Sequence, residues 1–253
     1  MRTAPRTVLV TGASRGIGAA IARALAADGH RVACAARAAA PLEAFVAEIG
    51  ALAVPFDVTD RTALAPALAR VEAALGPVEV LVSNAGISGS APFAKVADAD
   101  WDATIEVNLS AGFRLARAVV PGMVARGFGR VVFVASNAGL AGYAYTAAYC
   151  AAKHGVVGLM RSMAVELART GVTVNAVCPG FVETDMARDA IARIAATTGR
   201  DAAEARAALE RLNPQRRLIQ PEEVAHAVRG LVDDAARGVN GQALVVDGGQ
   251  VMA

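Results

Sequence analysis

The stretch "RTVLVTGASRGIG" (residues 6–18) joins a short apolar run to a glycine-rich turn and then to an alanine-rich segment. The apolar run predicts a buried strand, and the residues near 16–28 predict a helix. Glycine lets the backbone of such a turn approach a phosphate closely, while the helix N-terminus presents free N–H groups. The spacing is G-x-x-x-G-x-G rather than G-x-G-x-x-G, so a turn that merely packs helix on strand is also possible.

The same alternation continues along the rest of the chain. Six further apolar runs predict strands: "RVACAA", "ALAVPF", "VEVLVS", "RVVFVAS", "VTVNAV" and "ALVVD". Helices are predicted between them near 41–49, 60–75, 102–126, 149–169 and 221–234. Strand, helix and strand at this spacing predict a doubly wound α/β fold, a parallel sheet with helices on both faces. Residues 184–219 interrupt the alternation, and so long an excursion predicts a functional lid.

Composition limits the classes of function. The 253 residues are enough for a single α/β domain over 1–253, and a net charge of +2 gives no strong attraction to nucleic acid. The uncharged run 131–152 is broken by polar residues and glycines, so we expect no membrane span. Three distant cysteines, Cys34, Cys150 and Cys178, lack metal-site spacing. With no visible signal peptide, we expect a cytoplasmic protein with reduced thiols and no metal.

The second predicted strand ends where an acidic residue would bind the 2′-hydroxyl of an adenine ribose. Ala36 occupies that position, Arg37 follows it, and Arg15 lies inside the glycine-rich turn. Two cations without an acid favour a ribose 2′-phosphate, as in NADP. The alternative is that Arg37 is only a solvated arginine at a helix edge.

"YCAAK" (residues 149–153) places Tyr149 and Lys153 four residues apart, which puts both on one face of a helix. A nearby ammonium favours phenolate and so lowers the pKa of a tyrosine. Taken alone, the pair is more typical of the surface of an amphipathic helix than of a catalytic site.

Four motifs in a fixed order favour a catalytic role for the Tyr149–Lys153 pair over a surface pair. With "TGASRGIG" (11–18), "SNAG" (83–86), "YCAAK" and "NAVCPGFVET" (175–184), the chain resembles the short-chain dehydrogenase/reductase family over nearly its whole length. The resemblance implies a Rossmann-like fold in the compact one-domain form. Residues 153–184 look most like ketoreductases of 3-oxoacyl thioesters and polyketides, and like 3-hydroxybutyrate dehydrogenases.

The resemblance also implies roles for individual residues. Ser136 would bind the substrate oxygen, and Tyr149 would be the acid–base residue. Lys153 would bind the nicotinamide ribose and lower the pKa of Tyr149, while Asn108 would hold a water of the proton relay. The residues expected to bind the cofactor, besides Tyr149 and Lys153, are Gly12, Ser14, Arg15, Gly16, Ile17, Gly18, Arg37, Asp57, Val58, Asn84, Ala85, Gly86, Pro179, Gly180, Val182 and Thr184. Ser83 and Ala135 depart from the family pattern without removing a catalytic group.

The substrate is predicted from the residues that the resemblance places around it. Residues 137–149, with Ser88 and the lid near Met186, would line the pocket. Its wall is mostly apolar and lacks the charged clamp that hydroxybutyrate dehydrogenases use for a free carboxylate. This favours a 3-oxoacyl group carried on coenzyme A or an acyl carrier, reduced with NADPH rather than NADH in a reaction that is reversible as a 3-hydroxyacyl dehydrogenation.

Two other functions remain open at this point. One is dehydrogenation of a small secondary alcohol, a 3-hydroxy acid or a steroid, and the other is a non-catalytic NADP-binding sensor or scaffold. By the same resemblance we expect a homotetramer, with helices 102–126 and 149–169 pairing across one interface and the last strand in another. No nucleic-acid or membrane partner is expected.

Overall fold

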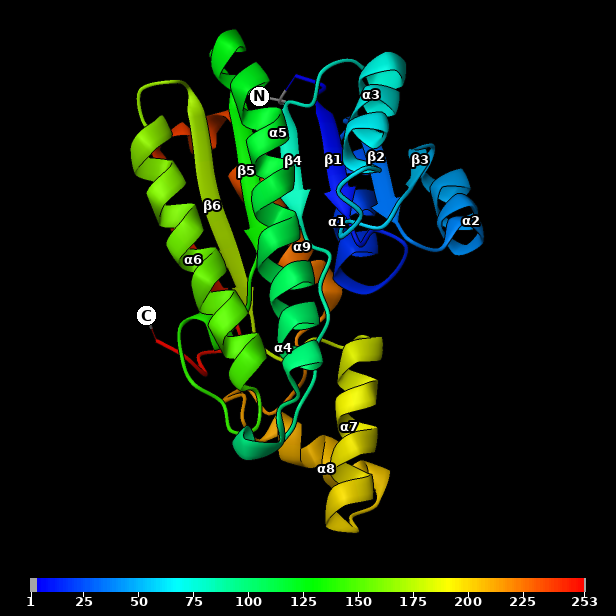
Figure 1. The fold of residues 1–253 in the computed structure, drawn as a ribbon, viewed down its shortest axis with the longest axis vertical. Helices are drawn as coiled ribbons and strands as arrows, with labels where there is room; N and C mark the ends of the chain where they lie inside the picture. Colours follow the sequence, from blue (N-terminus) through cyan, green and yellow to red (C-terminus); the bar gives the residue numbers. More distant parts are fainter. Residues whose placement is uncertain (1–3, 253) are drawn as a thin grey trace.

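The strands of the protein are short runs of valine, leucine and alanine that pair in parallel. The computed structural model describes residues 4–252, and within them seven strands form one sheet in the order β3-β2-β1-β4-β5-β6-β7 (Figure 1). Alternate residues of a strand face opposite sides, so Val8 and Val10 enter one core cluster and Leu9 enters the other. The strands are β1 (Thr7–Thr11), β2 (Arg31–Ala36), β3 (Leu52–Pro55), β4 (Val80–Ser83), β5 (Gly129–Val134), β6 (Val172–Pro179) and β7 (Ala243–Val246).

Helices cover both faces of this sheet. On one face α1 (Gly16–Ala27), α2 (Ala39–Ile49) and α9 (Pro221–Val232) bury their apolar side chains against the strands. On the other face α3 (Leu64–Leu75), α5 (Ala111–Arg126) and α6 (Ala147–Leu167) do the same. The prediction of a doubly wound α/β fold is confirmed.

The predicted helix 102–126 differs from the structure. It begins earlier, as α4 (Asp98–Ile105), and a π-helical turn (Glu106–Ser110) separates it from α5. A π-helical turn holds one residue more than an α-helical turn, and such turns are frequent at functional sites. Here the turn carries Asn108, which is only 5% exposed.

The predicted lid region contains two helices. They are α7 (Asp185–Thr198) and α8 (Ala202–Glu210), and they lie beyond the carboxyl ends of the strands (Figure 1). Their small core comprises Ala187, Ile191, Ala205, Leu209 and Leu218. A bridge between Val182 and Ile219 brings the two ends of the region together.

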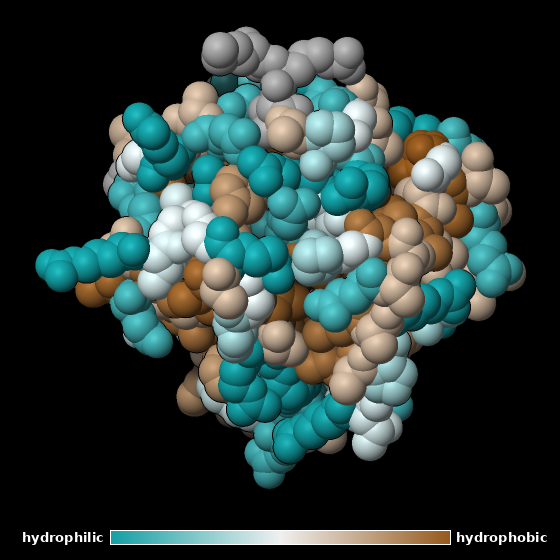
Figure 2. Space-filling model, turned by 90° about the horizontal axis from the view of Figure 1, so that it is seen from above, coloured by the Kyte–Doolittle hydropathy of each residue, from teal (hydrophilic) through white to brown (hydrophobic). Residues whose placement is uncertain are grey.

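The amino ends of the strands lie on the other side of the molecule from α7 and α8. Seen from above, hydrophilic and hydrophobic side chains are interspersed over this side (Figure 2). Arg6 pairs there with Glu79 and Asp234 at 3.0 Å each and stacks 3.8 Å from the ring centre of Phe128. In the described part of the chain, every helix is too short or too polar to cross a bilayer.

Candidate active site

The glycine loop (residues 12–18) is packed so tightly that side chains would not fit at two of its glycines. Gly12 has φ +64°, and a Cβ atom there would lie 2.9 Å from the side-chain nitrogen of Asn84. A Cβ atom on Gly18 would overlap the carbonyl oxygen of Gly12. These two glycines therefore let the loop pack closely on itself and on the end of β4, and a side chain at either position would displace it.

The end of β4 holds this loop in place. The Asn84 side chain donates hydrogen bonds to the carbonyl oxygens of Thr11 and Gly12, at 2.9 and 3.2 Å. The Thr11 hydroxyl accepts from the backbone N–H groups of Asn84 and Ala85, at 3.0 and 3.1 Å. The structure thus brings the motifs "TGASRGIG" and "SNAG" together, as a shared cofactor site would need.

The amino end of α1 is suited to an anion. Its N-cap residue, Arg15, has extended backbone and makes no side-chain capping bond. The free N–H groups of the first turn, which includes Gly16, Ile17 and Gly18, therefore have no capping side chain from Arg15, and Ser14 precedes this N-cap residue. Together with the close backbone of Gly12, this end of α1 fits the phosphates of a dinucleotide.

The two predicted phosphate-binding arginines both lie beside acids. Arg37 is 4.0 Å from Asp57, and Arg15 is 3.2 Å from Asp185 at the start of α7. Both guanidinium groups are mostly exposed, so these pairs are weak. Hydrogen bonds from Thr59 lower the pKa of Asp57, and the charge of Arg37 lowers it further. Val58, expected beside adenine, packs against a core cluster.

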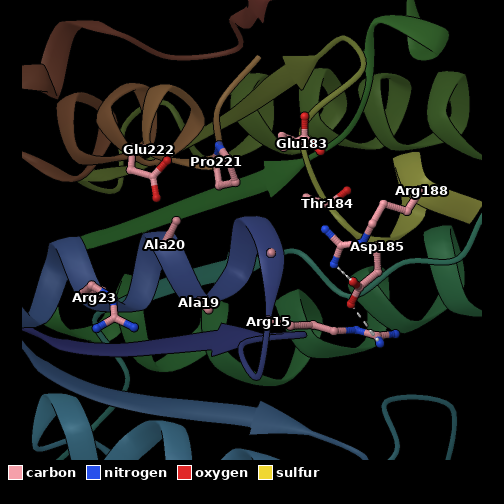
Figure 3. A pocket seen from close by; sticks show the side chains of 11 residues that line it. Arg15, Ala19, Ala20, Arg23, Glu183, Thr184, Asp185, Arg188, Pro221 and Glu222 are labelled. Carbon is pink, nitrogen blue, oxygen red and sulfur yellow. Dashed lines mark hydrogen bonds and ion pairs between the residues drawn. The ribbon is translucent and has the colours of Figure 1, made fainter. Parts of the chain in front are cut away.

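Residues from β6 onward close the other side of the site. Thr184 lies against the glycine loop, since a Cβ atom on Gly16 would be 3.1 Å from its methyl group. Arg15 and Arg188 both pair with Asp185 beside a cavity of about 310 Å³ between α1 and the start of α7 (Figure 3). Pro179, Gly180 and Val182 connect the end of β6 to this point.

Ser136, Tyr149 and Lys153 meet beyond the end of β5. Ser136 is 8% exposed, and its hydroxyl accepts a hydrogen bond of 3.1 Å from the N–H of Ala138. One turn of α6 separates Tyr149 from Lys153, whose Nζ is 5.6 Å from the tyrosine ring centre. Lys153 is 4% exposed and donates to the carbonyl oxygen of Val134 at 3.0 Å. The pair is therefore not a surface pair.

Asn108 is brought to the same place by the π-helical turn. Its side-chain nitrogen donates to the carbonyl oxygens of Ile87 and Thr104, at 3.0 and 2.9 Å, and its oxygen accepts from the N–H of Ile87 at 3.2 Å. A Cβ atom on Gly86 would be 2.8 Å from that oxygen and 3.8 Å from Nζ of Lys153. Both amide donors are used, so only oxygen atoms of Asn108 remain to hold a water.

The electrostatics of the pair differ from the prediction. Burial raises the pKa of Tyr149 to about 12, and the nearby Ser136 hydroxyl offsets this in part. Burial also lowers the pKa of Lys153 to about 8. The prediction that Lys153 lowers the pKa of Tyr149 is therefore not met by the protein's own groups, because its ammonium points at Val134. A phenol with so high a pKa is protonated at neutral pH.

The buried ammonium has a measurable consequence for stability. A pKa lowered to about 8 means that burying the charge destabilises the fold below that pH, by about 3 kcal/mol. We expect Lys153→Met to abolish activity yet raise the free energy of unfolding by about 1–3 kcal/mol at pH 7. The gain is full below pH 8 and fades as pH rises toward the ordinary lysine pKa, ~10.4. Urea unfolding of both proteins at pH 7 and pH 10 measures it, and an equal gain at both values would contradict this origin.

Sequence reasoning missed several residues around this site. Asp185 pairs with Arg15, and Asn137 contacts Asp247 from the segment after β7. The signal for the second contact was present in "VDGGQ" (246–250), where an acid and two glycines follow a strand. In the described residues no group of three or more His, Cys, Asp or Glu side chains could hold a metal ion.

Comparison with known proteins agrees with this geometry. Residues 6–195 match the family described as short chain dehydrogenase. The chain is 41% identical over 247 residues to the 3-oxoacyl-[acyl-carrier-protein] reductase MabA of Mycobacterium tuberculosis, covering 98% of this chain and 93% of the relative. It is 40% identical over 252 residues to an acetoacetyl-CoA reductase of Shinella zoogloeoides, covering 97% and 98%.

A solved structure is similar over nearly the same length. It is that of a single-residue variant of actinorhodin polyketide ketoreductase with NADPH. The two chains superpose with a TM-score of 0.94 at 40% identity, covering 97% of each.

Proposed function

Because the chain belongs to the short-chain dehydrogenase/reductase family, we propose that it is an NADPH-dependent ketoreductase that reduces the 3-oxo group of an acyl thioester or polyketide. The family and its reductase relatives show an oxidoreductase that acts on a carbonyl or hydroxyl group with a nicotinamide cofactor. The observation that carries the proposal is the meeting of Ser136, Tyr149 and Lys153 beside Gly86 and the Asn108 turn.

In this proposal the chain's residues bind, orient and protonate the substrate, while the bound nicotinamide cofactor supplies hydride. Tyr149 donates its phenolic proton to the substrate oxygen, and a pKa of about 12 keeps that proton available at neutral pH. Ser136 donates a hydrogen bond to the same oxygen. Lys153, charged below its pKa of about 8, would bind the nicotinamide ribose.

NADPH rather than NADH is supported by the charges near the expected adenine ribose. Arg15 and Arg37 are exposed cations at this edge, and Ala36 leaves no acid at the end of β2. The similar polyketide ketoreductase was solved with NADPH. The glycine loop and the uncapped α1 would hold the phosphates, and Thr184 would lie near the nicotinamide.

The substrate class is tested by rates with NADPH on matched compounds. We expect a 3-oxoacyl thioester to be reduced with a higher kcat/KM than the free 3-oxo acid or a simple ketone of the same chain length. The relatives named for acyl-carrier and coenzyme A substrates support this order. A higher kcat/KM with the free acid or the simple ketone would favour a small-molecule dehydrogenase. NADPH binding without turnover of any of the three would favour a sensor or scaffold.

We propose that α7 and α8 form the substrate lid. They follow directly on Thr184, pack on each other, and are joined to the loop before α7 by an ion pair between Arg206 and Glu183. Replacing residues 190–212 by a short glycine-rich linker is expected to raise KM for long thioesters by about 10-fold or more, while NADPH affinity changes little. Equal losses for substrate and cofactor would instead indicate a general defect of the fold.

We also propose the homotetramer and the cytoplasmic location. Phe113 on α5 and Val165 on α6 are large apolar residues that are 42% and 80% exposed, which supports pairing of these helices between copies. The cysteines are unpaired, Cys34 and Cys178 being buried, which suits a reducing compartment. Light scattering in solution tests the tetramer directly.

A further inference from the structure

The segment after β7 (residues 247–251) folds around one buried carboxylate. Asp247 is 2% exposed, and its oxygens accept from the N–H groups of Gly249 and Gln250 at 3.0 Å and of Val251 at 2.9 Å. The fourth donor is the side chain of Asn137, at 3.1 Å, from 110 residues earlier in the chain. All these donors are neutral, so hydrogen bonds rather than an ion pair satisfy the carboxylate.

Asp247 lies where two strands end. Asn137 directly follows Ser136 at the end of β5, and a Cβ atom on Gly180, after β6, would be 2.8 Å from the Cβ of Asp247. The Ser136 hydroxyl is itself 3.5 Å from the carbonyl oxygen of Pro179. Asp247 therefore binds the residue after the proposed substrate-binding serine through its carboxylate, and its Cβ atom lies against a glycine proposed to contact the nicotinamide.

A second hydrogen bond reaches further into the substrate loop (residues 137–149). The side-chain amide of Gln250 donates to the hydroxyl of Tyr143 at 2.9 Å, and both side chains are partly buried. Burial raises the pKa of Tyr143 to about 12, so the phenol stays neutral and this hydrogen bond persists across the working pH range. The two contacts hold the loop at its start and at its middle.

We propose that the segment 247–251 is a positioning element for the substrate loop, with Asp247 holding Asn137 and Gln250 holding Tyr143. The inference rests on the proposed function only in calling residues 137–149 a substrate loop. Its consequence is specific: loss of the Gln250–Tyr143 bond loosens the loop and weakens substrate binding, while the cofactor site at the glycine loop is untouched.

The test removes each partner of the Gln250–Tyr143 hydrogen bond in turn. Gln250→Leu and Tyr143→Phe each remove one partner, and the double variant removes both. We expect each to speed backbone hydrogen exchange by about 5-fold at Leu140 and Ala141, whose N–H groups both donate to the carbonyl oxygen of Asn137 at 3.0 Å, since one hydrogen bond contributes about 1 kcal/mol. KM for the 3-oxoacyl thioester should rise by a similar factor, with kcat and the Kd for NADPH within about 2-fold of wild type. The double variant should resemble the single ones, because they break the same bond.

Gln242→Leu is the matched control. The Gln242 amide is exposed and donates to the carbonyl oxygen of Asn240, away from the loop, so exchange and kinetics should not change. Unchanged exchange in Gln250→Leu and Tyr143→Phe would overturn the proposal. So would additive effects in the double variant, or equal losses of substrate and NADPH binding. The exchange measurement needs no substrate, so it supports or overturns positioning even if the proposed ketoreductase activity fails.

Discussion

Tyr149→Phe is expected to lower turnover by at least ~100-fold while NADPH binding stays nearly unchanged, because general acid–base catalysis contributes ~10²–10⁴-fold. The substitution removes one oxygen and retains the ring, which lies 5.6 Å from Nζ of Lys153. In the reduction direction, the lost hydroxyl is the proposed proton donor to the substrate oxygen. Single-turnover rates with saturating NADPH measure this step separately from cofactor binding.

The Kd for NADPH and the thermal midpoint serve as controls for Tyr149→Phe. Both should remain close to wild type, because the proposed phosphate contacts are in the glycine loop rather than on α6. If the variant keeps more than about a hundredth of wild-type turnover, Tyr149 is not the acid–base residue. Ser136 or an ordered water would then have to donate the proton.

NADPH is expected to be preferred over NADH by at least ~10-fold in kcat/KM, since a hydrogen bond to a charged group contributes ~1.5–3 kcal/mol. Exposure of Arg15 and Arg37 screens part of this gain. The 2′-phosphate must also compete with Asp185 for Arg15 and with Asp57 for Arg37.

Ala36→Asp combined with Arg37→Ile is expected to reverse the preference. The new carboxylate would accept from the ribose hydroxyl and repel a phosphate, so one change favours NADH and penalises NADPH. Initial rates with both cofactors at fixed substrate and salt measure the ratio, and added salt should narrow it in the wild type.

Arg229→Ile is the matched control for the loss of an arginine. Arg229 is exposed on α9 and pairs with Asp28 at the carboxyl end of α1, away from the glycine loop, so its removal should leave the cofactor ratio unchanged. Equal use of NADH and NADPH by the unmodified protein would show that Arg37 is a solvated residue at a helix edge. That result would contradict the predicted NADPH preference.

Much of this protein was predictable because the deciding patterns are local. Alternating apolar runs and alanine-rich segments predicted the parallel α/β sheet, since each strand and helix is specified by its own periodicity. The four-residue spacing of Tyr149 and Lys153 placed both on one helix face for the same reason. The glycine loop was predicted from its place between an apolar strand and an alanine-rich helix. In each case a few neighbouring residues are sufficient to predict the local structure.

Only the tertiary structure decided the features that depend on distant partners. The π-helical turn at Asn108 lies within a stretch whose sequence pattern predicts one continuous helix. The Asn108 side chain forms hydrogen bonds with the backbone of Ile87, 21 residues earlier in the chain. The pKa of Lys153 follows from burial that its neighbours in sequence do not reveal. Asp247 and Asn137 meet because β5 and β7 both flank β6 and so end at one edge of the sheet. Local sequence specifies each strand, but packing alone determines which strand ends become neighbours and which charges they bury.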